Sequence, residues 1–290
     1  MLYALYTAGF FLAGVLPHGF CYFLAEMSAR IYFFTCGDDK TKLKSNIRQV
    51  LGKDVSEAVL DRHVRRIYIN FAKYLVDFFK FRGVTKEYIK KNFTIHNVEA
   101  LDKCRQKGNG AILLTAHLGN WELGGAVVAG LGYPVSAIVW EHPDEKINNL
   151  FSSRRADNNL KCIPLGMQIK NCFKVLKRNE ILAIAGDKNY TAGGLEVEFF
   201  GKKAVMPQGA AAFSIKTGAP IVIGFLIRDK NDSFILSFAD PIEYPVTGDH
   251  DGDIQGLMKC CMVIFEKYIE KYPDQWYVFD YIWKPEKTIQ

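Results

Sequence analysis

The sequence predicts an α/β protein with a mixed, largely parallel sheet flanked by helices, together with an N-terminal membrane-anchor helix and a helical extension. Three observations indicate this class. From residue 92 onward, short apolar runs of strand length alternate with helical segments, as in βαβ units. The chain opens on an uncharged apolar stretch, and a basic helical stretch follows it. We therefore divide the chain into an apolar membrane anchor (1–34), a basic helical extension (35–91) and an α/β domain (92–290).

The apolar beginning carries no charged residue from Met1 to Ala25. A helix over Leu2–Leu16 would be roughly 22 Å long, which is short of the roughly 30 Å hydrocarbon core of a bilayer. Pro17 should kink a longer helix or split it in two. No basic residue precedes the apolar run, so a cleaved signal peptide fits badly. We expect an uncleaved anchor that spans the membrane or lies at its interface; a hairpin buried in the core is the alternative.

The basic extension carries 14 basic and 5 acidic residues between Lys40 and Lys91, a net +9 in a chain whose total is +6. Helical periodicity predicts helices over Lys42–Leu51 and Ser56–Phe81. Such a stretch beside an apolar segment suits an anionic membrane surface or an acidic partner. A solvated helical face is the alternative. The overall charge is too small to indicate nucleic-acid binding.

The α/β domain is predicted element by element from apolar runs and turn residues. The stretch Ile95–Leu101 should be a strand that leads into a short helix. The later strands are expected at Ala111–Ala116, Pro134–Trp140, Lys161–Pro164, Ile181–Ala185, Leu195–Phe200, Pro220–Ile227 and Ser233–Phe238. The helices are expected at Asn120–Ala129, Lys146–Asn159, Ile169–Lys177, Gln208–Thr217 and Ile254–Tyr272. The last two strands should pair antiparallel, which makes the sheet mixed.

The stretch Thr115–Glu122 (TAHLGNWE) is the most informative candidate site. His117 follows a buried strand, and ligands gather at the carboxyl ends of strands in open α/β sheets. Gly119 permits a tight turn, and Asn120 is a good helix N-cap. Backbone N–H groups near Gly119 and Asn120, or near Gly209, could stabilise an oxyanion.

A carboxylate beside His117 would make it a general base held in one orientation. Glu122 lies five residues away and can reach His117 only if the chain turns between them. Glu196 and Glu198 share one face of a later strand, and both also fit the exposed face of an edge strand. Asp187 ends another buried strand.

Other classes of site find little support. The seven cysteines are odd in number and form no C-x-x-C pair or Cys/His cluster, which disfavours a disulfide framework or a zinc site. No Gly-rich phosphate loop or Ser nucleophile elbow is present. Arg154 and Arg155 form a basic pair that could hold a phosphate or simply be solvated.

Five motifs in order resemble the lipid A biosynthesis lauroyl/myristoyl acyltransferase family, within the wider H-x4-D/E glycerolipid acyltransferases. They are HLGNWE, NNLFSSRR, the strand that ends in Asp187, VEFFG with QGAAAFSIKTGAPIV, and YPDQWYVFDYIWK. The resemblance covers nearly the whole chain. It implies a membrane-bound enzyme at the cytoplasmic face of the inner membrane. Such an enzyme moves a fatty acyl group from acyl carrier protein or acyl-CoA to a hydroxyl of a membrane glycolipid, with no metal or cofactor.

The resemblance also implies site residues. His117 and Glu122 match the catalytic motif, and Arg154 or Arg155 matches a phosphate contact of the donor or acceptor. Asp187 matches a substrate-site Asp. The stretch LEVEFFG is closer to the branch that acylates mannosylated phosphatidylinositol, where the strand Glu, here Glu196, partners the His.

The sequence departs from the family at two places. The usual Asp-Gln pair is Asp187-Lys188, and the closing segment has FDYI (279–282) where the lipid A enzymes carry His and Arg. Both departures concern the acceptor. An acyl-thioester hydrolase and a non-enzymatic lipid-binding protein are the alternative functions. We expect a long saturated acyl chain to be preferred over acetyl, although no residue marks the end of the acyl site.

Overall fold

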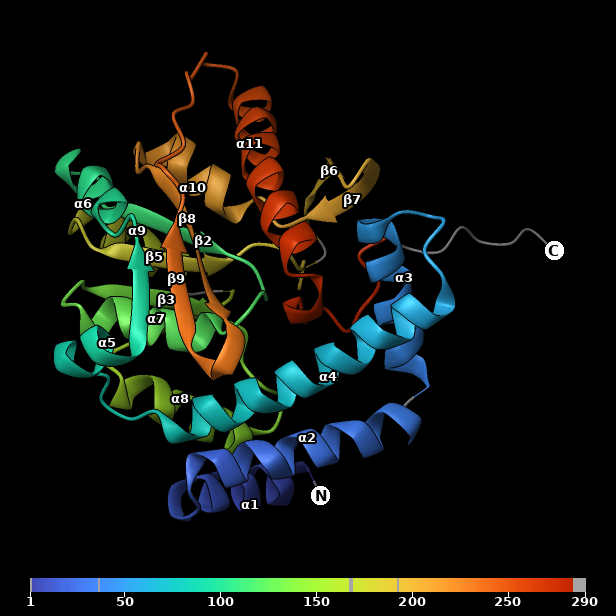
Figure 1. The fold of residues 1–290 in the computed structure, drawn as a ribbon. Helices are drawn as coiled ribbons and strands as arrows, with labels where there is room; N and C mark the ends of the chain where they lie inside the picture. The colour runs from blue at the N-terminus through green and yellow to red at the C-terminus, as the bar shows by residue number, and fades with distance from the viewer. Residues whose placement is uncertain (1, 36, 167–168, 192, 284–290) are drawn as a thin grey trace.

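The computed structural model describes residues 2–35, 37–166, 169–191 and 193–283 (Figure 1). The α-helices are α1 Leu2–Val15, α2 His18–Thr35, α3 Asp38–Leu51, α4 Glu57–Lys80, α5 Lys86–Asn92, α6 Glu99–Gln106, α7 Trp121–Gly130, α8 Glu145–Asp157, α9 Ile169–Lys177, α10 Gly209–Thr217 and α11 His250–Lys271. The strands are β1 Phe93–His96, β2 Ala111–Thr115, β3 Val135–Val139, β4 Lys161–Pro164, β5 Ile181–Ala185, β6 Leu195–Phe199, β7 Lys202–Met206, β8 Ile221–Arg228 and β9 Phe234–Phe238. Short 3₁₀ turns occupy Lys230–Asp232 (η1) and Pro273–Gln275 (η2).

The main sheet has seven strands in the order β1-β9-β8-β2-β5-β3-β4. The five strands from β8 to β4 run parallel, because each pair among them is parallel. Strand β9 is antiparallel to β8, and β1 lies parallel to β9 at the edge. The prediction of a mixed, largely parallel sheet, with an antiparallel pair formed by its last two strands in the sequence, is therefore confirmed.

Helices cover both faces of this sheet. Along β2, Ile112 and Leu114 belong to a core that also contains residues of α9, α10 and α11, whereas Leu113 packs with α6 and α7. This alternation follows from the two-residue period of a strand. All four residues from 111 to 114 are buried, as expected for a parallel strand between two helical layers.

The first two helices form a hairpin split at Pro17, and α4 lies between this hairpin and the sheet domain (Figure 1). The split expected of Pro17 is therefore confirmed, while the membrane anchor itself stays a prediction. Lys80 of α4 donates to the carbonyl oxygens of Ala13 (2.6 Å), near the end of α1, and of Leu16 (2.7 Å), the residue after α1. A cation at this position also complements the negative end of the helix dipole.

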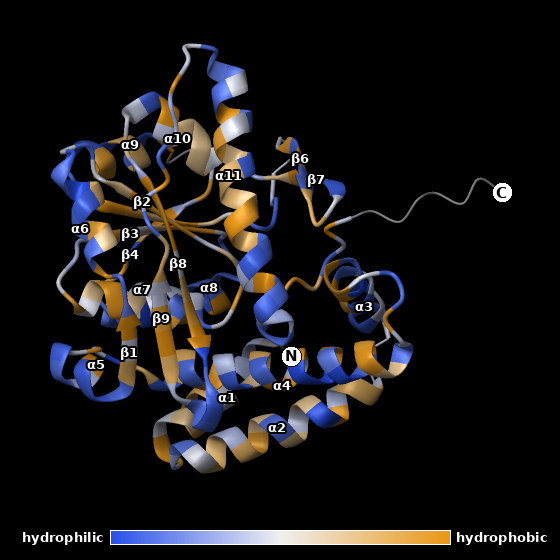
Figure 2. Ribbon diagram, turned by 45° about the horizontal axis from the view of Figure 1, so that its top comes forward, coloured by the Kyte–Doolittle hydropathy of each residue, from blue (hydrophilic) through white to orange (hydrophobic). Residues whose placement is uncertain are grey.

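The hairpin has one buried and one exposed apolar face. Cys21, Ala29 and Phe33 point inward and are buried. The outer face, which we call the apolar face, comprises Leu5, Phe11, Leu12, Val15, Phe20, Phe23, Met27, Ile31 and Phe34, all exposed. Figure 2 shows that hydrophobic residues recur along the ribbon of α2. Within the described ranges, no helix combines the length and apolar character that crossing a membrane requires.

Two elements differ from the sequence-based expectation. The short helix α5 was not expected. Strand β6 forms a hairpin with β7, which was not predicted as a strand because it begins with the charged residues Lys202 and Lys203. Phe200 and Gly201 both have positive φ (51° and 69°), which is the conformation of a two-residue hairpin turn. A Phe at the first of these positions is unusual, so the turn is hard to recognise in the sequence.

Candidate active site

Two neighbouring strand ends bring His117 and Asp187 together. Strands β2 and β5 are parallel neighbours in register, with Thr115 opposite Ala185. Each strand is followed by one further residue and then by the polar side chain, so His117 and Asp187 stand at the same offset. The backbone N–H of Gly186 donates to the Thr115 carbonyl (2.8 Å) and extends the pairing beyond the strands.

Asp187 accepts three hydrogen bonds. The Nδ1 atom of His117 lies 2.7 Å from Asp187 Oδ1, and the His117 backbone N–H donates to Oδ2 (2.9 Å). The indole N–H of Trp276, which follows η2, also donates to Oδ2 (2.8 Å). An ionised carboxylate only accepts, so in the neutral imidazole the proton sits on Nδ1 and Nε2 keeps its lone pair. Trp276 was missed as a site residue because nothing in the sequence links it to a strand end.

The carboxylate of Asp187 is completely buried. Burial alone would raise the pKa of Asp187, but the charge of His117 and the hydrogen bonds from His117 and Trp276 outweigh it. Together they hold the pKa of Asp187 below its usual range. Asp187 is therefore an anion placed directly behind the imidazole. It was expected to contact substrate; instead it contacts His117.

The turn after His117 is held from two sides. The N–H of Gly119 donates to the Gln275 carbonyl and that of Asn120 to the Leu226 carbonyl, both at 2.8 Å. A side chain at Gly119 would lie 2.1 Å from the Leu226 carbonyl oxygen, so only glycine fits there. Both N–H groups are occupied, and the expectation that they stabilise an oxyanion is wrong.

Asn120 caps α7, as expected, since its Oδ1 accepts from the Leu123 N–H (3.0 Å). Its Nδ2 donates to Asp77 (3.1 Å), and the residue is only 2% exposed. It does not line the pocket beside His117. The expectation that Asn120 contacts substrate is therefore wrong, because both ends of its side chain are used inside the protein.

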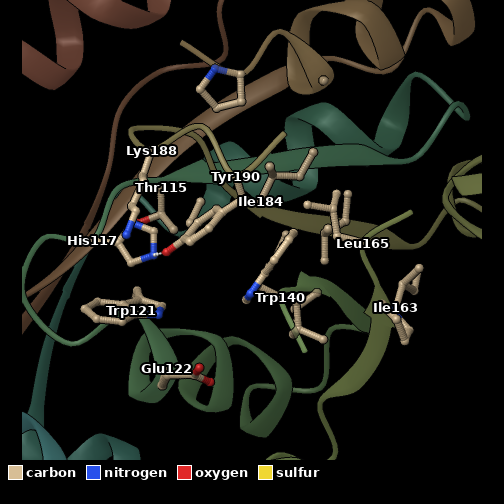
Figure 3. Close-up of a pocket in the computed structure, with 18 of the residues that line it drawn as sticks. Thr115, His117, Trp121, Glu122, Trp140, Ile163, Leu165, Ile184, Lys188 and Tyr190 are labelled. Carbon is tan, nitrogen blue, oxygen red and sulfur yellow. Dashed lines mark hydrogen bonds between the residues drawn. The ribbon is translucent and has the colours of Figure 1, made fainter. Parts of the chain in front are cut away.

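A pocket of about 700 Å³ opens in front of His117 (Figure 3). Its volume lies within the usual range for sites that enclose small organic ligands. Part of its wall is apolar, and we call this part the apolar arm. Ile163, Cys172, Ile184 and Phe213 line it on the α9–α10 side of the sheet, Ala137 and Ala183 line it on the α7 side, and Leu165 and Ile169 complete it. The other arm is aromatic and includes Tyr6, Phe71, Tyr74, Phe151, Tyr277 and Phe279.

Tyr190 and Trp140 stand at the His117 end of the pocket (Figure 3). The Tyr190 hydroxyl lies 3.4 Å from His117 Nε2, and its ring stacks on Trp140 with centroids 5.3 Å apart. Burial, with the charges of Asp187 and Asp280, raises the pKa of Tyr190 to about 12. The phenol is thus neutral near pH 7 and can donate to Nε2. A hydroxyl therefore reaches the face of the imidazole that opens to the pocket. Neither aromatic residue was singled out in the sequence.

Glu122 lines the pocket, but its carboxylate lies away from His117 (Figure 3). It is bound to Arg155 instead. Arg155 Nε lies 3.0 Å from Glu122 Oε2, and NH2 lies 2.5 Å from Oε1. Burial alone would lower the pKa of Arg155, but the charge of Glu122 and its hydrogen bonds outweigh burial and raise the pKa of the guanidinium. Since Glu122 is committed to this ion pair, the expectation that it orients His117 is wrong.

The neighbouring Arg154 is not placed to hold a phosphate. Its side chain is 2% exposed, stacks on Phe10 at 4.4 Å and pairs with Asp157 at 3.1 Å. Of the two arginines predicted from the sequence, only Arg155 lines the pocket.

Glu196 lies on the exposed face of the β6–β7 hairpin and pairs with Lys203 (2.7 Å). It is absent from the wall of the pocket. The expectation that Glu196 partners His117 is wrong, because the hairpin is a separate two-stranded sheet. Glu198 is likewise exposed on the same face, as an edge strand allows.

Gly209 begins α10 and lines the pocket. The first N–H groups of a helix have no partner within the helix and carry the positive end of its dipole. The N–H groups of Gly119 and Asn120 are occupied, so the N–H groups near Gly209 are the remaining candidates for stabilising an oxyanion.

The arrangement defines an enzyme site of one class. A buried carboxylate fixes an imidazole whose second nitrogen faces a pocket, and that pocket continues into an apolar arm. Such a site can remove a proton from a hydroxyl while an apolar chain lies beside it.

Comparisons with known proteins agree with this class. The family described as bacterial lipid A biosynthesis acyltransferase matches residues 1–285. The chain is 23% identical over 285 residues to the phosphatidylinositol mannoside acyltransferase of Mycolicibacterium smegmatis, covering 96% of this chain and 90% of that protein. It has the same identity to the phosphatidylinositol mannoside acyltransferase of Mycobacterium tuberculosis, with 96% and 87% covered. The chain belongs to the bacterial lipid A biosynthesis acyltransferase family and is an acyltransferase.

Proposed function

We propose that this acyltransferase moves a long fatty acyl chain from acyl carrier protein or acyl-CoA to a hydroxyl of a membrane glycolipid. The observation that carries the proposal is the position of His117, which is held by Asp187 and faces an apolar pocket of about 700 Å³. The acceptor is a lipid A precursor or a phosphatidylinositol mannoside. The printed names of the two mycobacterial relatives favour the second.

In the proposed reaction, His117 Nε2 takes the proton of the acceptor hydroxyl as that oxygen attacks the thioester carbonyl carbon. The carbonyl electrons move to the oxygen, and N–H groups near Gly209 stabilise the resulting oxyanion. When the carbonyl reforms, the carbon–sulfur bond breaks and His117 returns its proton to the leaving thiolate. The products are an ester and a free thiol. The thioester bond supplies the driving force, so the reaction needs no metal or cofactor.

Asp187 has a distinct part in this scheme. It keeps the proton on Nδ1 before the reaction and stabilises the imidazolium while His117 holds the second proton. Its burial increases this effect, because charges interact more strongly where water is excluded.

We also propose that the protein acts at the cytoplasmic face of the inner membrane, with the apolar face of α1 and α2 in the lipid interface. Nine large apolar side chains on that face are at least 43% exposed. Single exposed apolar residues are common on soluble proteins, but a group of this size marks a surface that binds a partner or a membrane. The basic stretch from Lys40 to Lys91 follows it and suits anionic lipid headgroups.

The membrane proposal is best tested with exposed substitutions, since removing the hairpin would uncover the side of α4 on which it packs. Phe11, Phe23 and Ile31 changed together to Glu should abolish co-sedimentation with phosphatidylethanolamine/phosphatidylglycerol vesicles in high salt, where the attraction of the basic stretch is screened. Val263→Glu, on an equally exposed position of α11, is the control. Unchanged binding of the triple variant in high salt would contradict the proposal.

The deciding experiment for the reaction combines a labelled palmitoyl thioester with a bacterial glycolipid extract. Transfer of label to a glycolipid, with release of thiol in equal amount, is the expected result. Thiol release with free palmitate instead would make the protein an acyl-thioester hydrolase. Binding without thiol release would leave only a lipid-binding role. Replacing the acyl-CoA by acyl carrier protein in a parallel reaction identifies the donor.

A further inference from the structure

A buried polar cluster lies behind the active site, outside the pocket. Its centre is Asp77 of α4, which is 0% exposed. Asp77 Oδ1 accepts from the hydroxyl of Tyr22 on α2 and lies 3.4 Å from Nε2 of His18. Asp77 Oδ2 accepts from NH2 of Arg228, at the end of β8, and from Asn120 Nδ2 (3.1 Å). Four elements of the fold thus meet at one carboxylate.

Three members of the cluster bond to one another in a ring. Arg228 NH1 also donates to the Tyr22 hydroxyl (2.7 Å), so Arg228, Tyr22 and Asp77 form a ring of hydrogen bonds. Burial alone would lower the pKa of Arg228, but Asp77 more than offsets this and raises it. Well-packed apolar residues often stabilise a fold as much as a buried ion pair does. A contribution to stability alone therefore does not account for a buried ion pair at this position.

Asn120 connects the cluster to the active site. Its Oδ1 caps α7, and its Nδ2 reaches Asp77, so one side chain ties the end of the turn that follows His117 to both α7 and α4. A second connection runs through Gln275. Its backbone carbonyl accepts from the Gly119 N–H, and its side-chain amide bonds the backbone N–H and carbonyl of Arg228, which pairs with Asp77. A displacement of Asp77 would thus be transmitted to the backbone that carries His117.

The other end of the cluster is the apolar hairpin. Tyr22 and His18 lie on α2, and Lys73 of α4 joins Glu26 of α2 (2.9 Å) to Asp232 (3.0 Å). The inner face of the hairpin is thus connected by polar contacts to the turn beside the imidazole, while its outer face is apolar and exposed.

We propose that Asp77 is a positioning residue for His117, acting through Asn120, and that the contact of Tyr22 with Asp77 makes turnover depend on the seating of the α1–α2 hairpin. The inference rests on the proposed acyl transfer for its kinetic readout only. Small displacements of a reacting group are costly, since an error of about 1 Å can lower a rate by roughly 10². Asp77 itself touches neither the pocket nor a reacting atom.

The test uses the partners of Asp77, because removing a buried carboxylate beside Arg228 would itself destabilise the fold. Asn120→Ser keeps a cap for α7 but is too short to reach Asp77. Tyr22→Phe keeps the ring and removes the hydrogen bond from α2. Tyr133→Phe is the matched control, because Tyr133 makes a similar hydrogen bond to Asp102 far from the site.

We expect kcat for palmitoyl transfer to fall roughly tenfold in Tyr22→Phe and up to about 10² in Asn120→Ser, with KM for the thioester unchanged. The double variant should lose less than the product of the two losses, since both act through Asp77. Tyr133→Phe should keep the wild-type kcat. If both variants lose thermal stability but keep kcat at a temperature where they are folded, the cluster is structural only and the proposal is overturned.

A second readout does not need activity. The proton on His117 Nδ1, which is bound to Asp187, should give a separate downfield NMR signal that His117→Gln removes. That signal should move or broaden in Asn120→Ser and Tyr22→Phe but not in Tyr133→Phe. If the wild type shows no acyl transfer, the proposed function is wrong. The NMR signal still tests whether Asp77 positions His117. An unchanged signal in both variants would then overturn the inference.

Discussion

The Nδ1 atom of His117 lies 2.7 Å from a carboxylate oxygen of Asp187, although 70 residues separate the two in the chain. The contact exists because β2 and β5 are parallel neighbours in register and each places its polar residue at the same distance beyond the strand. The carboxylate behind the imidazole is therefore provided by the sheet, and the nearby Glu122 is free to form the ion pair with Arg155.

Replacing His117 by Ala should lower acyl transfer by roughly 10²–10⁴, the usual contribution of a general base. The fold should survive, because His117 lies at a strand end beside an open pocket rather than in the core. Turnover of a palmitoyl thioester and the circular dichroism spectrum are the measurements. His250→Ala, at an exposed position of α11, should have no effect. Near-normal turnover of folded His117→Ala would remove the central claim.

Replacing Asp187 by Asn should lower kcat by a similar factor of roughly 10²–10⁴, because a neutral amide no longer fixes the Nδ1 proton or stabilises the imidazolium. Glu196→Gln should retain almost full activity, since its carboxylate is exposed and pairs only with Lys203. Steady-state kinetics on the two variants compares them directly. A large loss in Glu196→Gln together with an active Asp187→Asn would reverse the assignment.

The Glu122–Arg155 pair should contribute mainly to stability. Both side chains are about one-tenth exposed, so Glu122→Gln leaves a buried guanidinium without its anion and should lower the free energy of unfolding by about 3–5 kcal/mol. Arg155→Gln should have a comparable cost, and the double variant should recover part of it. Urea unfolding measures all three. Single-variant losses that simply add in the double variant would contradict the coupling.

The pH dependence of stability should carry the signature of Asp187. Its pKa is lower in the folded than in the unfolded state, so the unfolded chain binds more protons in this range and stability rises with pH. The contribution is complete above the ordinary Asp pKa of about 3.9 and is lost as pH falls through the folded-state value. Urea unfolding between pH 7 and pH 3 should therefore show a shallower acid loss in Asp187→Asn than in the wild type.

The control for this pH series is Asp251→Asn, because the Asp251 side chain is fully exposed. Its acid profile should match that of the wild type. If Asp187→Asn and the wild type lose stability in parallel as the pH falls, the Asp187 carboxylate does not interact as an anion with His117.

The fold was largely predictable because its elements have strong local signals. The runs AILLT and ILAIA are apolar and of strand length, and each lies between turn residues, so β2 and β5 were located to within a residue. The hairpin turn at Phe200 and Gly201 was missed because a Phe with positive φ has no sequence signature. Pro17 correctly marked the break between α1 and α2. That these two helices pack on α4 could not be predicted, because the composition of a segment does not show which element it contacts.

The site was predictable in part, for a different reason. His117 was found from its place after a strand, and Asp187 was noted for the same reason, yet the pairing of the two required knowing that β2 and β5 are neighbours. The equal offset of the two residues from their strands was the available signal. Short sequence distance favoured Glu122 instead, although only a side chain at the same sheet edge could reach Nδ1. Trp276 and Tyr190 come from loops whose positions the sequence does not fix.

The length of the acyl chain should depend on two alanines in the wall of the apolar arm. Ala137 of β3 and Ala183 of β5 are register partners, so their side chains lie together on the pocket face. Larger side chains there would occupy space that the end of a long chain needs. The wild type should prefer a palmitoyl over an acetyl thioester, because apolar contact grows with each buried methylene.

In Ala183→Leu, the preferred thioester should become shorter: KM for palmitoyl should rise several-fold while KM for octanoyl changes little. Ala129→Leu adds the same volume on α7 at a position outside the pocket wall and should leave the chain-length profile unchanged. A chain-length series of KM values, with thermal unfolding to exclude overpacking, makes the comparison. Equal rates with acetyl and palmitoyl in the wild type would show that this arm does not hold the chain. An unaltered profile in a stable Ala183→Leu would place the end of the chain elsewhere in the pocket.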